Sequence, residues 1–289
     1  MGSTSDGTIY RGNVDRGDVD VFLPGGEDGR TAATGVKVDN QGRLWVAARD
    51  TGRAFVYDVA TGDLVRALST PETDRTLIND LTFTPDAAFF TDSFRPVVWR
   101  VARSPERVGA MRPWLDLRDT PVPGDTDFRL NGISASDDGR VLLTVHFDTG
   151  RLFRINVATE EVTEVDLGGA TLTTGDGILL DGRTLLVVRE DPGAVFPVRL
   201  APDLTSGTVG APFGEGFALP TTLAEYEGSV LVVNSQLDDT DSPELPFTVS
   251  RVTLPDQAEL GSSPSGAGAD GGGDVAGDPF VQRPPVPVR

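Results

Sequence analysis

Asn79, Asn131 and Asp176 are the residues whose types and spacing could do chemistry in this 289-residue chain. Each stands at the start of a short apolar segment, in NDLTFT, NGISAS and DGILLD. If these segments are equivalent strands around one axis, the amide and carboxylate oxygens converge, and such oxygens suit Ca²⁺, Mg²⁺ or Mn²⁺. Asp80 follows Asn79 and can approach the same point. A simpler alternative is that Asn and Asp only close turns at the entry to each strand.

A hard cation at this point would polarise a carbonyl group and lower the pKa of bound water. Asp176 would then position or deprotonate that water as the catalytic residue. The residue types therefore favour metal-dependent hydrolysis at a carbonyl group.

A repeated strand unit must position these residues. The tetrapeptide DTGR and the tripeptide VAT each occur twice, at an offset of 98 residues, so the chain contains a duplicated unit. A finer repeat begins at residues 34, 79, 131, 176 and 221, with spacings of 45, 52, 45 and 45 residues. Four short strands in about 40–50 residues are typical of a β-propeller blade, whose first strand lines the central channel.

The rest of the chain agrees with an all-β fold. The 34 Gly and 21 Pro residues divide it into short runs rich in Val, Leu and aromatic residues, which are typical of strands. Residues 8–25 resemble only the third and fourth strands of a blade, and one period before residue 34 falls upstream of Met1. We therefore expect a six-bladed propeller over residues 1–256, with five complete blades plus this strand pair, and we interpret Met1 as a late start or the result of a truncation. Residues 257–289 are rich in Gly, Ser, Asp and Pro and are predicted to form a disordered tail.

Composition excludes several functions. A net charge of −19 argues against nucleic acid and anionic membranes as partners. The chain has no Cys and one His, which removes disulfides, thiolate sites and multi-His zinc motifs. We expect a monomer that acts on a small molecule. The sequence as given shows neither a signal peptide nor an apolar run long enough to span a membrane.

The hairpins between the second and third strand of each blade should form the pocket walls. The residues predicted there to bind substrate are Arg49, Arg95, His146 and Gln236, with Phe94 and Glu190 in the same walls. The longest of these loops spans residues 235–246 and is either a lid or a solvated acidic loop. His146 could shuttle a proton, although a lone His at a strand end more often packs or faces solvent. No GxSxG motif supports a Ser-His-Asp triad.

Three segments carry a resemblance to a known family: LINDLTFTPDAAFFTDS, LNGISASDDGR and GDGILLDGRTLLVV. They resemble the senescence-marker-protein, gluconolactonase and luciferin-regenerating-enzyme superfamily of six-bladed propellers, especially its bacterial, often exported members. The resemblance runs from about Thr8 to Pro255. It implies one divalent metal, calcium first and Mg, Mn or Zn as alternatives, held by a Glu, two Asn and an Asp that is also the base in lactone hydrolysis. It also implies that the full-length protein is secreted or extracytoplasmic.

Residue by residue, the two Asn correspond to Asn79 and Asn131, and the Asp to Asp176. The Glu has no counterpart, because in the family it opens the first blade, and Thr34 is not a carboxylate. We therefore expect this chain to bind the metal weakly or not at all. Two alternatives stay open: a non-catalytic propeller that binds a ligand or protein with structural calcium, and a metal-independent enzyme of the strictosidine-synthase-like kind.

Overall fold

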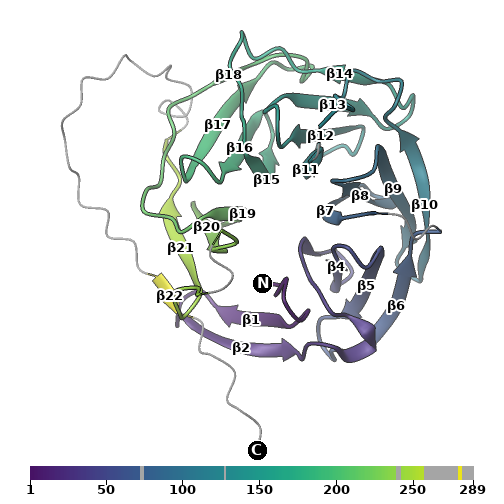
Figure 1. The fold of residues 1–289 in the computed structure, drawn as a ribbon, viewed down its shortest axis with the longest axis vertical. Coiled ribbons are helices and arrows are strands. Elements are labelled where there is room, and N and C mark those ends of the chain that lie inside the picture. The colour runs from purple at the N-terminus through teal and green to yellow at the C-terminus, as the bar shows by residue number, and fades with distance from the viewer. Residues whose placement is uncertain (72–74, 127, 239–241, 257–278, 282–289) are drawn as a thin grey trace, which may run out of the picture.

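A ring of antiparallel sheets surrounds a central channel in the computed structural model (Figure 1). The structure describes residues 1–71, 75–126, 128–238, 242–256 and 279–281. Apart from the single 3₁₀ turn η1 (Glu27–Gly29), every regular element in these segments is a strand. The prediction of an all-β propeller is confirmed, and helix is nearly absent as expected.

Five of the sheets have four strands each, ordered from the channel outward. The first contains β3 (Val36–Val38), β4 (Arg43–Ala47), β5 (Arg53–Asp58) and β6 (Leu64–Ser69). The second contains β7 (Ile78–Phe83), β8 (Ala87–Asp92), β9 (Val97–Ser104) and β10 (Arg107–Asp116). The third contains β11 (Leu130–Ala135), β12 (Val141–His146), β13 (Leu152–Asn156) and β14 (Val162–Glu164).

The fourth sheet contains β15 (Gly175–Asp181), β16 (Thr184–Arg189), β17 (Ala194–Leu200) and β18 (Gly207–Val209). The fifth contains β19 (Pro220–Tyr226), β20 (Ser229–Asn234), β21 (Thr248–Thr253) and β22 (Pro279–Val281). The five inner strands begin within two residues of the starts expected from the repeat. β22 falls inside the segment predicted as a tail, and the remainder of that segment, 257–278 and 282–289, lies outside the described residues.

The sixth sheet has two strands, β1 (Ile9–Asn13) and β2 (Asp18–Leu23), as the partial blade at residues 8–25 predicted. Arg30 fixes this pair to the neighbouring sheet and is itself fully buried. Its guanidinium donates to the Gly7 carbonyl at 2.6 Å, to the Pro24 carbonyl at 2.8 Å and to the Tyr57 hydroxyl on β5. A buried cation that satisfies several acceptors at once holds the β1–β2 pair in the ring.

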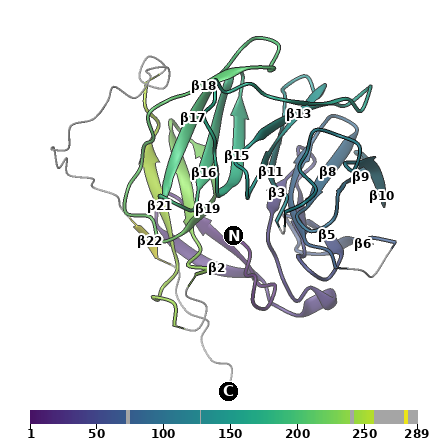
Figure 2. The ribbon, with the colours of Figure 1, turned by 45° about the horizontal axis from the view of Figure 1, so that its top comes forward.

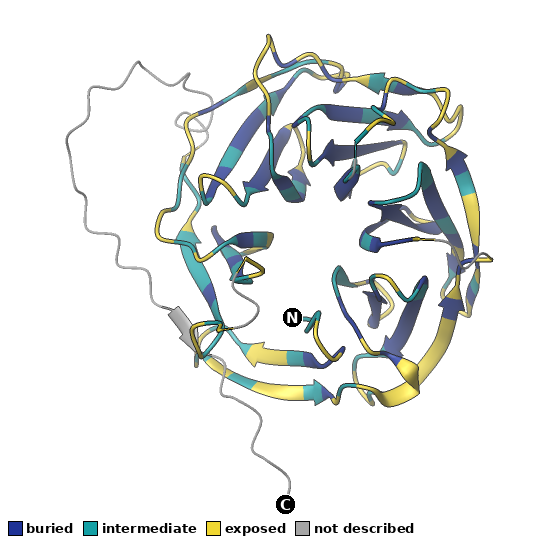
Figure 3. Ribbon diagram, viewed as in Figure 1, coloured by how far each residue is buried: buried dark blue, intermediate teal, exposed yellow. Residues whose placement is uncertain are grey.

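The core lies between adjacent sheets (Figure 3). The second strands show it best, because β8 and β12 are buried at all six positions and therefore have a sheet against each face. Trp45 on β4 packs edge-on against Phe83 of the next sheet, with ring centroids 5.7 Å apart. Trp45 thus contributes aromatic packing between adjacent blades. Among the described residues, no helix is long and apolar enough to cross a membrane.

Candidate active site

A β-bulge occurs at the start of four inner strands. The pairing register shifts between Ile78 and Leu81 in β7 and between Leu130 and Ile133 in β11. The same shift follows Gly175 in β15 and Pro220 in β19. The bulged positions are residues 79–80, 131–132, 176–177 and 221–222. The first residue of each pair is one at which the sequence repeat begins, and we call these first residues the rim residues. A bulge releases a residue from the ladder and re-aims its side chain, so the backbone sets the direction of these groups.

Glycine allows neighbouring inner strands to approach closely at these bulges. A β-carbon on Gly132 would lie 2.2 Å from the carbonyl oxygen of Asp176, and one on Gly177 would lie 2.7 Å from the Thr222 Cα. At the first sheet, the Gly35 amide donates to the Asn79 carbonyl at 2.8 Å. Figure 2 shows β11, β15 and β19 side by side at this part of the ring. The close approach brings the rim side chains of adjacent sheets within hydrogen-bond distance.

A chain of hydrogen bonds joins the predicted rim residues. The Asn79 side-chain amide donates to Ser93 Oγ at 2.9 Å and to Asn131 Oδ1 at 2.8 Å. Asn131 is 2% exposed, and its side chain hydrogen-bonds the carboxyl group of Asp176. The structure therefore brings Asn79, Asn131 and Asp176 together, from three different sheets.

Asp176 also forms a hydrogen bond with Glu190, which directly follows β16. Burial raises the pKa of the Asp176 carboxyl well above its ordinary value, and the charges of Glu190 and Asp80 raise it further. Burial likewise raises the pKa of Glu190. Two carboxyl groups in contact in a desolvated site each disfavour ionisation of the other.

Asp80 occupies the second bulged position of β7 and joins three sheets. Its carboxylate accepts a hydrogen bond from the Ile133 amide of β11 at 3.1 Å. Lys37 of β3 lies with Nζ 3.7 Å from Asp80 Oδ2 and donates to the Ile133 carbonyl at 3.2 Å. The charge of the one lysine in the chain is thus balanced by Asp80 at the channel wall.

A cavity of about 790 Å³ occupies the channel beside these groups. Asn79, Asp80 and Asp176 line it together with Lys37, whereas Asn131 and Glu190 are not among the lining residues. A ligand in the cavity would therefore meet Asp176 directly.

The four predicted substrate-binding residues are absent from the described lining of this cavity. The Arg95 guanidinium lies 5.0 Å from the ring centroid of Trp99. Arg49 is half-buried, and its backbone forms an isolated β-bridge with Ile78. The φ angle of Arg49 is 55°. Gln236 exchanges two hydrogen bonds with the Glu244 backbone and braces its own loop, of which residues 239–241 lie outside the described residues.

His146 is fully buried. Its Nδ1 accepts from the Thr149 amide at 3.4 Å, and Nε2 lies 3.2 Å from Thr126 Oγ1. Burial lowers the pKa of the imidazole, and Arg129 and Arg151 lower it further, against the opposing effects of a Pro123 hydrogen bond and Asp148. The structure thus places His146 in a packed setting, outside the lining of the channel cavity.

Glu190 is the residue whose position sequence reasoning missed, since we expected it in a pocket wall and not beside Asp176. The available signal was its place at the end of the second strand of its blade. β15 and β16 are antiparallel, with Gly175 opposite Arg189, so the start of one lies beside the end of the other.

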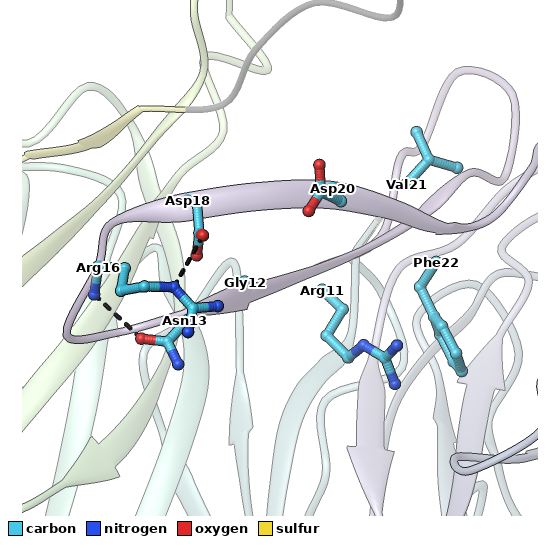
Figure 4. Close-up of a pocket in the computed structure, with 8 residues that line it drawn as sticks. All are labelled: Arg11, Gly12, Asn13, Arg16, Asp18, Asp20, Val21 and Phe22. Atoms are coloured by element: carbon cyan, nitrogen blue, oxygen red, sulfur yellow. Dashed lines mark hydrogen bonds and ion pairs between the residues drawn. The ribbon is translucent and has the colours of Figure 1, made fainter.

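A second, smaller pocket lies on the outer β1–β2 hairpin (Figure 4). Arg16 donates there to Asp18 at 2.9 Å, and both side chains are largely exposed. The eight residues that line it include none of the predicted site residues. A solvated ion pair of this kind contributes little to binding or stability, so the channel cavity is the candidate site.

No protein-family profile and no curated protein sequence matches the chain. Solved structures do match it. Virginiamycin B lyase from Staphylococcus aureus aligns with a TM-score of 0.55 at 16% identity, over 78% of this chain and 69% of that one. The Malassezia sympodialis allergen Mala s 1 gives 0.61 at 14% identity, over 82% and 83%. A nidogen/laminin complex gives 0.62 at 12% identity, over 88% of each chain. At these identities the likeness establishes the propeller fold.

Proposed function

We propose that this protein is a metal-assisted hydrolase that opens lactones or related esters at Asp176, in the channel cavity. The observation that carries the proposal is the position of Asp176, which lines the cavity and has side-chain hydrogen bonds with Asn131 and Glu190. The resemblance to the gluconolactonase superfamily supports it through Asn79, Asn131 and Asp176. The lyase among the solved neighbours supports it only by showing that an enzyme can have this fold.

Carboxyl groups supply the oxygen donors that a hard cation would use. Asp176 and Glu190 contact each other, and no ion pair joins either to a basic side chain within the described residues. Asn79 lines the cavity beside Asp176, whereas Asn131 Oδ1 already accepts from the Asn79 amide, and no group of three or more acidic or His residues suited to a metal occurs in the described part of the chain. Glu190 offers a second carboxylate where the resemblance left the family's Glu unmatched. When bound, the cation would supply polarisation of the carbonyl and of water.

The chain's own residues have separable roles. In its ionised form, which a bound cation would favour, Asp176 would orient a water molecule and take its proton as that water attacks the carbonyl carbon. Asn131 fixes the carboxyl group through their hydrogen bond, and Asn79 fixes Asn131 in turn. Asp80 and Lys37 neutralise each other and keep the neighbouring wall in place. Attack opens the ring, and the proton returns to the alcohol oxygen that leaves.

The test is hydrolysis of a panel of simple lactones with millimolar Ca²⁺, Mg²⁺ or Mn²⁺ and with a chelator. We expect metal-dependent turnover that falls at least about 100-fold in Asp176→Asn, the loss typical of a removed general base. Asp181→Asn is the matched control, because Asp181 lies on the same strand but is exposed at its far end.

Full activity in Asp176→Asn, or no turnover with any of the three metals, would refute the proposal. If calcium raises the unfolding temperature and no lactone is turned over, the chain is a binding propeller instead. A calcium concentration of about 100 times Kd should stabilise the fold by roughly 2.7 kcal/mol, which thermal unfolding can detect.

A further inference from the structure

The channel cavity has apolar side chains at its accessible wall. Val38 is 55% exposed and Leu237 is 37% exposed, and both line the cavity. Phe83, Leu179 and Leu223 line it too and are only partly buried. Single exposed apolar residues are ordinary on a protein surface, but several around one concave space are typical of a site that an apolar group covers.

The charges of the wall do not suit an anion. Lys37 is the one basic side chain in the described lining, and Asp80 already balances it at 3.7 Å. Met1 also lines the cavity, and its amine donates to the Tyr10 carbonyl at 2.9 Å. Asp176 and Glu225 add acidic groups to the same wall. A carboxylate or phosphate on the ligand would thus meet acidic groups and no unpaired basic side chain among these residues.

We propose that the substrates are neutral lactones or esters with an apolar chain or ring, and not polyhydroxylated sugar lactones or anionic ones. This inference rests on the proposed function. The apolar group would pack against the apolar wall residues Val38, Phe83, Leu179, Leu223 and Leu237, with the carbonyl at Asp176. These side chains offer no partner for sugar hydroxyls, which would lose their hydrogen bonds to water on binding. Of the polar groups in the same lining, Thr34, Asn234 and Ser235 already hydrogen-bond within the protein. Hydrolysis adds water across the acyl–oxygen bond and gives a hydroxy carboxylate, which the acidic wall would repel.

The experiment compares γ-lactones whose alkyl substituent grows from one to eight carbons with gluconolactone, using the full chain and Ca²⁺. We expect kcat/KM to rise about fourfold per added methylene until the cavity is filled, which is about 0.8 kcal/mol each. We expect gluconolactone to be hydrolysed at least about 100-fold more slowly than the best alkyl lactone.

Two matched variants test the wall. Leu237→Ser should flatten the dependence on chain length, whereas Leu245→Ser should leave it unchanged, because Leu245 is 60% exposed in the same loop but does not line the cavity. Equal slopes in the two variants would overturn the assignment of this wall.

Binding of the matching alkyl lactams, which are not hydrolysed, separates this inference from the proposed function. If lactams bind more tightly with each methylene and no lactone is hydrolysed, the cavity assignment stands and the hydrolase proposal fails. If lactones are hydrolysed without dependence on chain length, the substrate class is wrong and the hydrolase stands. If the lactams show no such trend and no lactone is hydrolysed, both fail.

Discussion

Gly132 lies against the backbone of Asp176 so closely that a β-carbon at residue 132 would be 2.2 Å from the Asp176 carbonyl oxygen. The contact joins the third sheet to the fourth at the point where both contribute a site residue. Because the clashing atom belongs to the backbone, a small side-chain movement cannot relieve it.

Gly132→Ala should therefore lower the free energy of unfolding by at least the roughly 1–3 kcal/mol typical of overpacking. Chemical denaturation monitored by tryptophan fluorescence measures this loss. Gly124→Ala is the control, since a β-carbon there meets nothing within 4 Å. Equal stability of the two variants would show that the inner strands separate more easily than the structure implies.

Asn131 is the residue on which the alignment of Asp176 depends. In Asn131→Ala, Asp176 loses its amide partner and Asn79 loses the Oδ1 acceptor, which should lower kcat about 100-fold with a smaller change in KM. The unpaired groups should also lower stability by about 1–3 kcal/mol. Lactone kinetics and denaturation measure the two effects separately. Asn156→Ala is the comparison, because Asn156 caps a turn through the Ala158 and Thr159 amides and should change stability alone.

His146 should make the fold sensitive to mild acid. Its pKa is lowered in the folded state by burial, so the unfolded chain binds the proton more readily. Stability from the neutral imidazole is complete above the unfolded pKa of about 6.5, declines as the pH falls below it, and is lost once the pH passes the folded pKa. The imidazole proton signals of the single His should titrate below pH 6.5 by NMR, and His146→Gln should lose less stability than the wild type between pH 7.5 and 5. A midpoint at or above 6.5 would contradict the buried, neutral state.

The fold was predictable because its signals are local and repeated. Runs such as RVLLTVHF and the spacing near 45 residues specify strands and their grouping without any knowledge of distant contacts. The same repeat placed Asn79, Asn131 and Asp176 at equivalent positions, and the structure joins them through the hydrogen bonds that run through Asn131.

The remainder of the site depended on backbone geometry that residue patterns do not encode. Arg49 and Gln236 have φ values of 55° and 51°, in the left-handed region that most residues avoid, so an extended hairpin was the wrong basis for placing their side chains. The contact of Glu190 with Asp176 depends on the register between β15 and β16. That register includes the bulge after Gly175, and no residue type in the sequence predicts a bulge at this position.

The bulges at the start of β7, β11, β15 and β19 also affect how the residues around the channel can change during evolution. The first bulged residue of each strand is Asn79, Asn131, Asp176 or Thr221, and none of these four is a partner in the strand ladder. Asn79, Asp176 and Thr221 line the cavity, so replacing one of these three changes what faces the channel while the pairing of that sheet is kept. New chemistry can thus arise one blade at a time by point mutation, and these three positions are available to a protein engineer for installing ligands.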